Sequence, residues 1–137
     1  MASLFKAAAR VEQIHASNHA AVIKELGGTS EAKLEDVVVQ STRQNLETAH
    51  KGEIYEHDEM YPAFIQQAQA GGNADVIRTL TSARAAEVEH VKLYGEALQH
   101  TSVVFYVCPV CGFTTRDPNL ARCSTCATPK ERFERVT

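Results

Sequence analysis

The chain has 137 residues, of which 44% are apolar and 23% charged, a balance typical of a folded globular protein rather than a disordered one. Its formal net charge is -3 and no basic run is longer than two residues, which argues against nucleic acid as a partner. No segment approaches the roughly 18 apolar residues of a membrane span, and the N-terminus lacks a signal-peptide pattern, so we expect a cytoplasmic protein with no membrane partner.

The first predicted element is a helix from Leu4 to Leu26. Apolar residues recur along it with a helical period, and Gly27 and Gly28 follow as a stop signal. Glu12 and His15 lie on the same stripe as those apolar residues. Residues 29–43 are polar and less periodic, with a β-branched run at 37–39. They are compatible with a crossing linker or with an early helical turn.

Two further helices are predicted, over residues 44–69 and 74–99. The apolar stripe of the first has a gap that Glu53 and Glu56 fill, and the stripe of the second is interrupted by Glu87 and His90. Pro62 cannot donate a backbone hydrogen bond and would leave the carbonyl of residue 58 free. The sequence therefore predicts a kink just beyond the two carboxylates.

From residue 101 onward the pattern changes to short strand-like runs at 103–107 and 113–115. This change divides the chain into a helical domain, 1–101, and a small C-terminal domain, 102–137. The second domain has little apolar core of its own beyond three aromatic residues, so we expect its folding to depend on a metal. Those residues are Tyr106, Phe113 and Phe133.

All four cysteines lie in this C-terminal segment, in two Cys-x-x-Cys pairs separated by eleven residues. Two such pairs can wrap one tetrahedral ion. Two disulfides would be the alternative in an exported protein, but the absence of a signal peptide favours a metal site in a reducing compartment. Iron and zinc both remain open, because each is bound by four thiolates. The proposed ligands are Cys108, Cys111, Cys123 and Cys126.

The helices carry a second set of metal-type side chains. Residues three apart share a helix face, so each Glu-x-x-His pair aims a carboxylate and an imidazole at one point. Several unpaired carboxylates in a helical core are unfavourable by several kcal/mol each unless a cation compensates them. Glu-x-x-His pairs with further glutamates are the ligand set of di-iron and di-manganese bundles. The candidate ligands are Glu12, His15, Glu53, Glu56, Glu87 and His90.

The segments that carry these ligands resemble the rubrerythrin family. Residues 45–56, NLETAHKGEIYE, followed by MYPAF at 60–64, are similar to one of its bundle helices, and EVEHVKLY at 87–94 matches its last. LFKAAARVEQIHA at 4–16 looks like its second helix. Tyr106, Gly112 and the ending PKERF at 129–133 resemble a short rubredoxin domain. Ala127 departs from that pattern, because a glycine is usual there, and Ser124 stands where proline is common.

The resemblance implies a mainly α fold: a ferritin-like bundle with three helices in this chain, followed by a rubredoxin-like metal-binding β domain. It implies that Glu12 and Glu87 bridge two irons, that Glu53 and Glu56 complete the pocket, and that His15 and His90 are imidazole ligands. Glu56 and His15 would exchange at one iron with redox state. Two tyrosines, Tyr61 and Tyr94, would lie close behind the ligands, although ordinary core positions would also explain them.

The resemblance further implies a peroxidase-type oxidoreductase. Electrons from an external donor, a reductase or a rubredoxin, would pass through one Fe(Cys)4 site to a non-haem di-iron centre and reduce hydrogen peroxide. In related proteins the four-cysteine iron lies close to the di-iron site of the opposite subunit. Because the family has a helix before the first one seen here, we expect a homo-oligomer, most simply a dimer that shares helices. The alternative is an iron-binding, storage or sensing protein with a structural zinc ribbon and no turnover.

Overall fold

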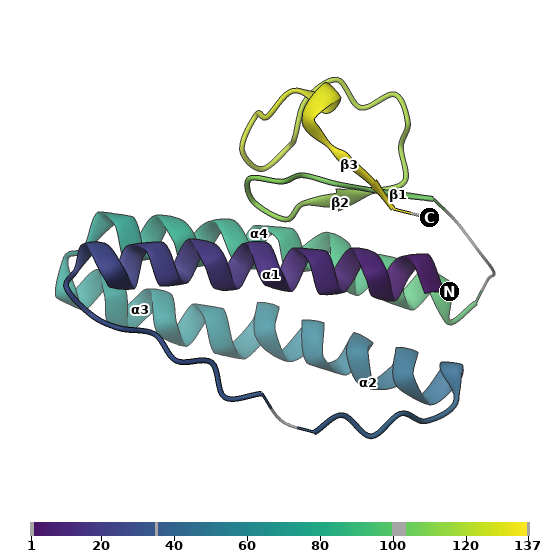
Figure 1. Ribbon diagram of the computed structural model, residues 1–137, viewed down its shortest axis with the longest axis horizontal. Helices are drawn as coiled ribbons and strands as arrows, with labels where there is room; N and C mark the ends of the chain where they lie inside the picture. The colour runs from purple at the N-terminus through teal and green to yellow at the C-terminus, as the bar shows by residue number, and fades with distance from the viewer. Residues whose placement is uncertain (1, 35, 100–103, 137) are drawn as a thin grey trace.

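Three long helical rods form the body of the molecule, and a small sheet domain packs against two of them (Figure 1). The structure is a computed structural model that describes residues 2–34, 36–99 and 104–136. The rods are α1 (Ala2–Glu25), the continuous α2 (Thr42–Tyr55) and α3 (Tyr61–Gly71), and α4 (Ala74–Ala97). The predicted ferritin-like helical fold is confirmed. No helix within the described residues has the length and apolar content needed to cross a bilayer.

α4 is the central helix, because it packs against α1, α2 and α3. The side chains that meet between α1, α2 and α4 form one apolar core, which also includes two residues of the first strand. That strand is therefore part of the bundle core as well as of the small sheet. The core consists of Leu4, Ala7, Val11, Ile14, Leu46, Leu93, Tyr94, Phe105 and Val107.

The connection between α1 and α2 is an extended linker with no regular secondary structure in its described residues. It runs along the α2–α3 rod from one end of the bundle to the other (Figure 1). The ambiguity of residues 29–43 is thus resolved in favour of a crossing linker. α2 begins at Thr42 because Ser41 caps it: the Ser41 side chain accepts from the Gln44 amide, and the Gln44 side chain accepts from the Ser41 amide.

The second rod departs from a regular α-helix close to the predicted place. A π-helical turn, Glu56–Met60, joins α2 to α3, and Pro62 lies in the first turn of α3. Proline is tolerated in a first turn, because its missing N–H has no partner to lose there. The irregularity therefore begins at a candidate ligand, Glu56, rather than beyond it.

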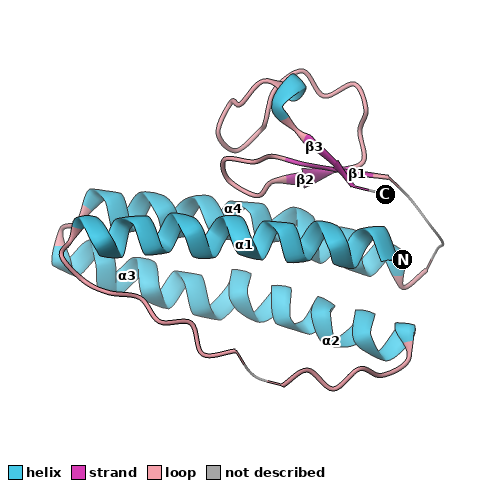
Figure 2. Ribbon diagram, viewed as in Figure 1, coloured by secondary structure: helices cyan, strands magenta, loops and turns pink. Residues whose placement is uncertain are grey.

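The C-terminal domain has three short antiparallel strands in the order β2-β1-β3. They are β1 (Phe105–Val107), β2 (Thr114–Thr115) and β3 (Glu134–Val136), with a short 3-10 turn, Lys130–Arg132, before the last (Figure 2). Tyr106 pairs with both Thr115 and Arg135 across the sheet. The expected strands at 103–107 and 113–115 are found in shortened form. Val103 and the predicted domain boundary at 101/102 lie outside the described residues.

The sheet domain rests on α1 and α4. Phe105 and Val107 are buried against the helices, whereas Phe113 and Phe133 pack around the cysteines as predicted. Tyr106, the third expected core aromatic, instead has the Lys130 ammonium 4.5 Å above its ring. At the edge of the contact, Arg10 makes a two-pronged ion pair with Glu134, at 2.7 and 2.8 Å.

Candidate metal centres

All six predicted carboxylate and imidazole ligands converge in the middle of the bundle. α1 contributes Glu12 and His15, α4 contributes Glu87 and His90, and the second rod contributes Glu53 at the end of α2 and Glu56 at the start of the π turn. Each Glu-x-x-His pair uses the three-residue spacing that places both side chains on one helix face. The helices themselves therefore position the cluster.

Glu87 lies at the centre of the cluster and is fully buried. One of its carboxylate oxygens is 2.5 Å from His90 Nδ1, and the other is 3.2 Å from His15 Nδ1. His90 Nδ1 is also 3.4 Å from the carboxylate of Glu53. The Glu12 carboxylate is 3.9 Å from His15 Nδ1, and 52% of its side chain is exposed.

The ligand atoms divide into three overlapping groups, each within 4.8 Å. The first is Glu12, His15 and Glu87, and the second is Glu53, Glu87 and His90. The third contains the four carboxylates Glu12, Glu53, Glu56 and Glu87. Because Glu87 belongs to all three groups, its two oxygens are placed to bridge two ions.

The buried glutamates of the cluster have shifted pKa values, and bound cations would compensate their negative charges. Burial raises the pKa of Glu53 to about 8, and burial together with the charges of Glu12 and Glu87 raises the pKa of Glu56 to about 7. Burial alone would lower the pKa of His90, but the neighbouring carboxylates of Glu53 and Glu87 raise it to about 10. Burial disfavours ionisation of Glu87 as well, yet the neighbouring His15 and His90 rings keep its pKa below its usual value.

Several buried polar atoms of the cluster have no hydrogen-bond partner, as expected for ligands of a metal pair. Among the described residues, His15 Nδ1, Glu53 Oε2 and Glu87 Oε1 are buried and make no hydrogen bond. Buried polar atoms are normally hydrogen-bonded, so such a group points to a missing partner. Carboxylate oxygens and imidazole nitrogens are ligands that suit iron and manganese. The donor set therefore fits a di-iron centre.

The Nε2 atoms of His15 and His90 make hydrogen bonds with the C-terminal domain. His15 Nε2 donates to the Cys111 carbonyl at 3.1 Å. His90 Nε2 is 3.2 Å from Thr114 Oγ1, and because that hydroxyl donates to the Gly112 carbonyl, the histidine donates here too. A proton on Nε2 leaves Nδ1 as the ligand nitrogen, which is how such contacts orient metal-binding histidines.

The two predicted tyrosines are buried close to the cluster. Tyr61 is 4% exposed and Tyr94 is 3% exposed, and burial next to the glutamate charges raises the pKa of both phenols. Both therefore keep their protons. The Tyr94 ring also packs on Phe5, at a centroid distance of 6.1 Å, and belongs to the bundle core.

His19 joins Tyr61 to the cluster. Its ring centroid is 6.5 Å from that of His15 and 6.3 Å from that of Tyr61, and its Nδ1 is 3.0 Å from Thr79 Oγ1. Burial lowers the pKa of His19, so its ring stays neutral. Its position one turn after His15 was the only sequence signal for this role. His50 instead packs near Gly95, and His100 lies outside the described residues.

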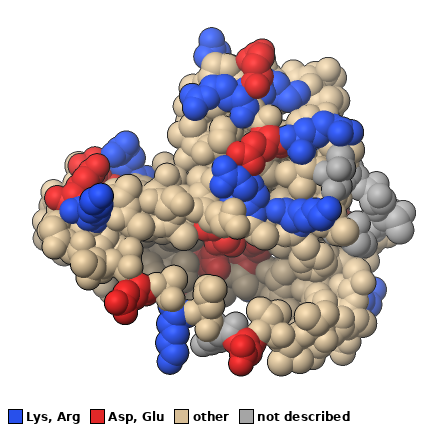
Figure 3. Space-filling view, viewed as in Figure 1, with Lys and Arg blue, Asp and Glu red and all other residues tan. Residues whose placement is uncertain are grey.

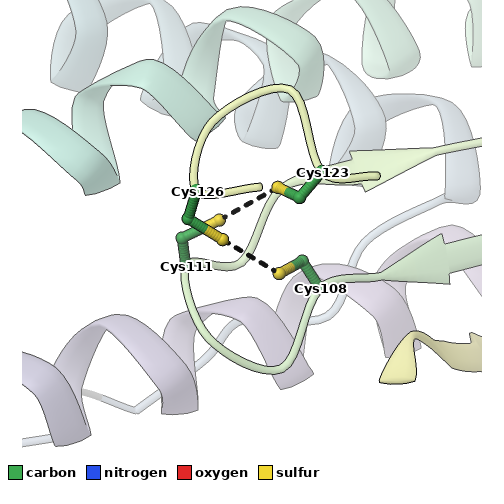
Figure 4. Close-up of side chains that lie close together, drawn as sticks. All are labelled: Cys108, Cys111, Cys123 and Cys126. Atoms are coloured by element: carbon green, nitrogen blue, oxygen red, sulfur yellow. Dashed lines mark hydrogen bonds between the residues drawn. The ribbon is translucent and has the colours of Figure 1, made fainter. Parts of the chain in front are cut away.

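The four cysteines form the second centre, with all four sulfurs within 4.8 Å of one another (Figure 4). The Sγ atoms of Cys108 and Cys126 are 3.6 Å apart, and those of Cys111 and Cys123 are 3.5 Å apart. A disulfide needs about 2.05 Å. Tetrahedral coordination with bonds of about 2.3 Å needs sulfurs about 3.8 Å apart. The spacing therefore fits one metal ion and excludes these disulfides.

The two cysteine pairs sit in matching backbone turns. Gly112 donates to the Cys108 carbonyl at 3.0 Å, and Ala127 donates to the Cys123 carbonyl at 2.9 Å. A hydrogen bond with Cys111 lowers the pKa of the Cys108 thiol to about 4, while the same contact raises the pKa of Cys111. A proton shared in this way is what a bound cation would replace.

Three features of the centres were not visible in the sequence. These are the Thr114 hydroxyl behind His90, the close approach of Gly112 to His15, and Arg84, which contacts the π turn. Each depends on a contact between distant parts of the chain. A helical bundle that holds four carboxylates and two histidines, joined to a rubredoxin-like four-cysteine site, defines the class of ferritin-like di-iron proteins.

A model of the rubrerythrin family matches residues 1–98, and the chain belongs to this family. Rubrerythrin-2 of Clostridium acetobutylicum is 37% identical over 140 residues, which cover 96% of this chain and 76% of that protein. Nigerythrin of Nitratidesulfovibrio vulgaris is 33% identical over 138 residues, which cover 97% of this chain and 68% of that protein. A solved structure of fully reduced, all-ferrous nigerythrin covers 98% of this chain and 69% of its own, with a TM-score of 0.89 and 33% identity.

Membership of this family makes the chain an oxidoreductase with a non-haem di-iron centre and a rubredoxin-like four-cysteine site. The assignment agrees with the sequence-based prediction of fold and cofactors. The individual ligands, the substrate and the partners are taken up below as proposals.

Proposed function

We propose that the chain reduces hydrogen peroxide at the carboxylate–histidine site, with electrons that enter through an iron at the four cysteines. The observation that supports this most is the direct contact between the two centres. One hydrogen bond, from His15 Nε2 to the Cys111 carbonyl, links a proposed imidazole ligand to a proposed thiolate ligand. A zinc ribbon that only stabilises the tail would have no need for this contact.

When bound, the irons supply the redox chemistry: single electrons arrive at the four-cysteine site, and two electrons with two protons convert peroxide to two waters. The six side chains described above would hold the metal pair. Glu87, which belongs to all three ligand groups, would be shared between the two ions, and Glu12 would be a ligand on the more open side. Glu53 and His90 would be ligands on one side of Glu87, and His15 would be a ligand on the other.

Glu56 and His15 are the proposed exchanging pair. Both are grouped with the same two carboxylates, those of Glu12 and Glu87, so both can reach the same side of the site. Glu56 is also less buried than Glu53, the other candidate ligand on the second rod, and it begins a π turn. Exposure and an irregular backbone give its carboxylate room to move. Tyr61 and Tyr94 stay protonated, and their buried rings help to exclude bulk water.

A stopped-flow experiment tests the proposed function. The anaerobically reduced iron protein is mixed with peroxide, and the ferric thiolate absorption of the four-cysteine site is followed. We expect the absorption to return rapidly, because electrons leave that site for peroxide through the di-iron centre. In Glu87→Ala the rate should fall by about 100-fold or more while the chromophore remains, since the common ligand of all three groups is gone.

Glu89→Ala is the matched control. Glu89 lies on the same helix, but its carboxylate contacts the Lys92 ammonium, at 3.5 Å, and is in none of the three ligand groups found among the described residues. Its rate should equal that of the unaltered protein. Unchanged peroxide reduction in Glu87→Ala would contradict the proposed site. Zinc at the four cysteines, with no peroxide-dependent colour change, would instead favour iron storage or sensing without turnover.

We also propose that a second copy of the chain completes the bundle, as part of a homo-oligomer. The acidic site is open on one side: Figure 3 shows acidic side chains at the back of a hollow between the helical layers. Four apolar side chains in the linker between α1 and α2 are 78 to 90% exposed. Exposed apolar patches of this kind are typical of interaction surfaces. These residues are Leu34, Val37, Val38 and Val39.

Sedimentation together with metal analysis tests this arrangement. We expect a dimer when both iron positions are filled. A monomer with a fully loaded di-iron centre would contradict it. The external electron donor and the cytoplasmic location remain predictions.

A further inference from the structure

The π turn between α2 and α3 changes the backbone hydrogen bonding of the His57 carbonyl. In this turn the Tyr61 amide donates to the Glu56 carbonyl, five residues back, instead of to the His57 carbonyl, four residues back. A π register would pair the His57 carbonyl with the amide of residue 62, but residue 62 is proline and has no N–H. The combination of the π turn and Pro62 therefore isolates the carbonyl of His57.

Arg84 of α4 supplies the missing donor. Its Nε donates to the His57 carbonyl at 3.0 Å, across 27 residues of sequence and from the facing helix. Arg84 is half-buried, and in the described part of the chain none of its nitrogens lies within 4 Å of a carboxylate. Its role is thus to bind a backbone group rather than to neutralise a nearby acid.

The contact links two groups of metal ligands. Arg84 precedes Glu87 by three residues, so both lie on the same face of α4. His57 directly follows Glu56, the first residue of the π turn. The hydrogen bond from Arg84 to the His57 carbonyl therefore sets the position of the Glu56 backbone relative to Glu87.

We propose that Arg84 is a positioning residue that holds the π turn so that Glu56 can reach the metal pair. The proposal rests on the assignment of Glu56 as a metal ligand. Without the guanidinium, the His57 carbonyl would have to turn towards water, as free helix carbonyls do, and the turn would move away from α4. Glu56 would then be displaced from the side of the site that it shares with His15.

Metal affinity, rather than activity, is the direct test. The metal-free bundle is titrated anaerobically with ferrous iron against a ferrous chelator, while the four-cysteine site keeps its ion. In Arg84→Met we expect the weaker-bound ion to lose affinity by about 10- to 100-fold, the range seen when groups behind metal ligands are removed. Arg84→Lys retains a donor and should recover most of the affinity. Arg78→Met is the matched control, because within the described residues Arg78 forms its ion pair with exposed Asp75 on the same helix.

A double variant separates positioning from simple stabilisation. In Arg84→Met combined with Pro62→Ala, the new amide at residue 62 can donate to the His57 carbonyl in the π register. Thermal stability should then recover, but the link to α4 is still missing and the weaker-bound ion should stay weak. Recovery of both would overturn the proposal, because Arg84 would then only satisfy a backbone group.

Glu56→Gln distinguishes the failure of this proposal from the failure of the site assignment. If Glu56→Gln binds both ions normally, Glu56 is not a ligand and the assignment fails. If Glu56→Gln weakens one ion but Arg84→Met does not, the assignment stands and the positioning role is wrong. If Arg84→Met does not fold, the iron affinity of Arg84→Lys is measured beside that of the control Arg78→Met. An affinity for the weaker-bound ion equal to that of the control and of the unaltered protein would support the donor role. A loss as large as that in Glu56→Gln would overturn it.

Discussion

Two residues with left-handed backbone conformations occupy equivalent places in the cysteine turns, but for different physical reasons. Gly112 has φ +80°, and a Cβ there would lie 2.7 Å from His15 Nε2 and 2.8 Å from Val11 Cγ1. Ala127 has φ +58° and carries its Cβ in a conformation that is unfavourable by roughly 1–2 kcal/mol for a residue other than glycine. The first turn needs glycine because the bundle approaches it, whereas the second merely prefers it.

We therefore predict opposite outcomes for two small substitutions. Gly112→Ala should displace His15 and reduce iron occupancy of the bundle, in addition to lowering the thermal midpoint. Ala127→Gly should leave iron occupancy unchanged and raise the free energy of unfolding by about 0.5 kcal/mol, the relief of strain less the greater freedom of glycine in the unfolded chain. Calorimetry and iron analysis of the two proteins check this. Equal iron content in both would refute the close approach at Gly112.

Short elements of the tail contribute to both the core of the bundle and the surroundings of the carboxylate–histidine cluster. β1 completes the bundle core with Phe105 and Val107, and β2 places Thr114 behind His90. The Thr114 hydroxyl accepts from His90 and donates to the Gly112 carbonyl, so its hydrogen-bonding capacity joins both centres. The tail therefore contacts both histidines that we propose as metal ligands, His15 and His90.

Thr114→Val tests this role of β2. Valine has the shape of threonine but cannot accept from His90 Nε2, so we expect the iron held by His90 to bind about 10- to 100-fold more weakly in a chelator competition. Thr115→Val is the control on the same strand, because the Thr115 hydroxyl accepts only from the Asp117 amide. If both variants bind iron equally, the Thr114 contact does not orient His90.

For the whole molecule, the buried cluster makes stability depend on pH when the bundle lacks metal. Ionising Glu53 and Glu56, with pKa values raised to about 8 and about 7 from 4.5, destabilises the fold as pH rises through this range. The stability that cationic His90 contributes is complete below 6.5 and is lost as pH rises towards its raised pKa of about 10. Glu87 has a lowered pKa and is ionised throughout.

All three raised pKa values therefore act in one direction between pH 6 and pH 9. With the bundle metal-free and the four-cysteine site still loaded, we expect the thermal midpoint by circular dichroism to be lower at pH 9, by roughly 5 °C or more. The di-iron protein should show a much smaller change, since the cations compensate the carboxylates at both pH values. A midpoint that is equal or higher at pH 9 without bundle metal would contradict this account.

The sequence by itself determined the elements and the ligand inventory. Helix periodicity, the Glu-x-x-His spacing and the paired Cys-x-x-Cys are local patterns, since they depend on residues three or four positions apart. From these patterns the rods, the six converging side chains and the four-thiolate site were all predictable. The residues quoted for the family resemblance also led to the family that the comparisons identify.

Only the tertiary structure decided how these parts meet. His15 contacts Cys111 across 96 residues, and Arg84 contacts His57 across 27, and no local spacing encodes such contacts. The same is true of the π turn at Glu56–Met60: its His57 carbonyl is tolerated because the facing helix supplies the donor, Arg84. Local sequence therefore specified which candidate ligands exist, and packing between distant segments specified which histidine nitrogen faces the cluster, which carboxylate lies at its centre and where the tail sits.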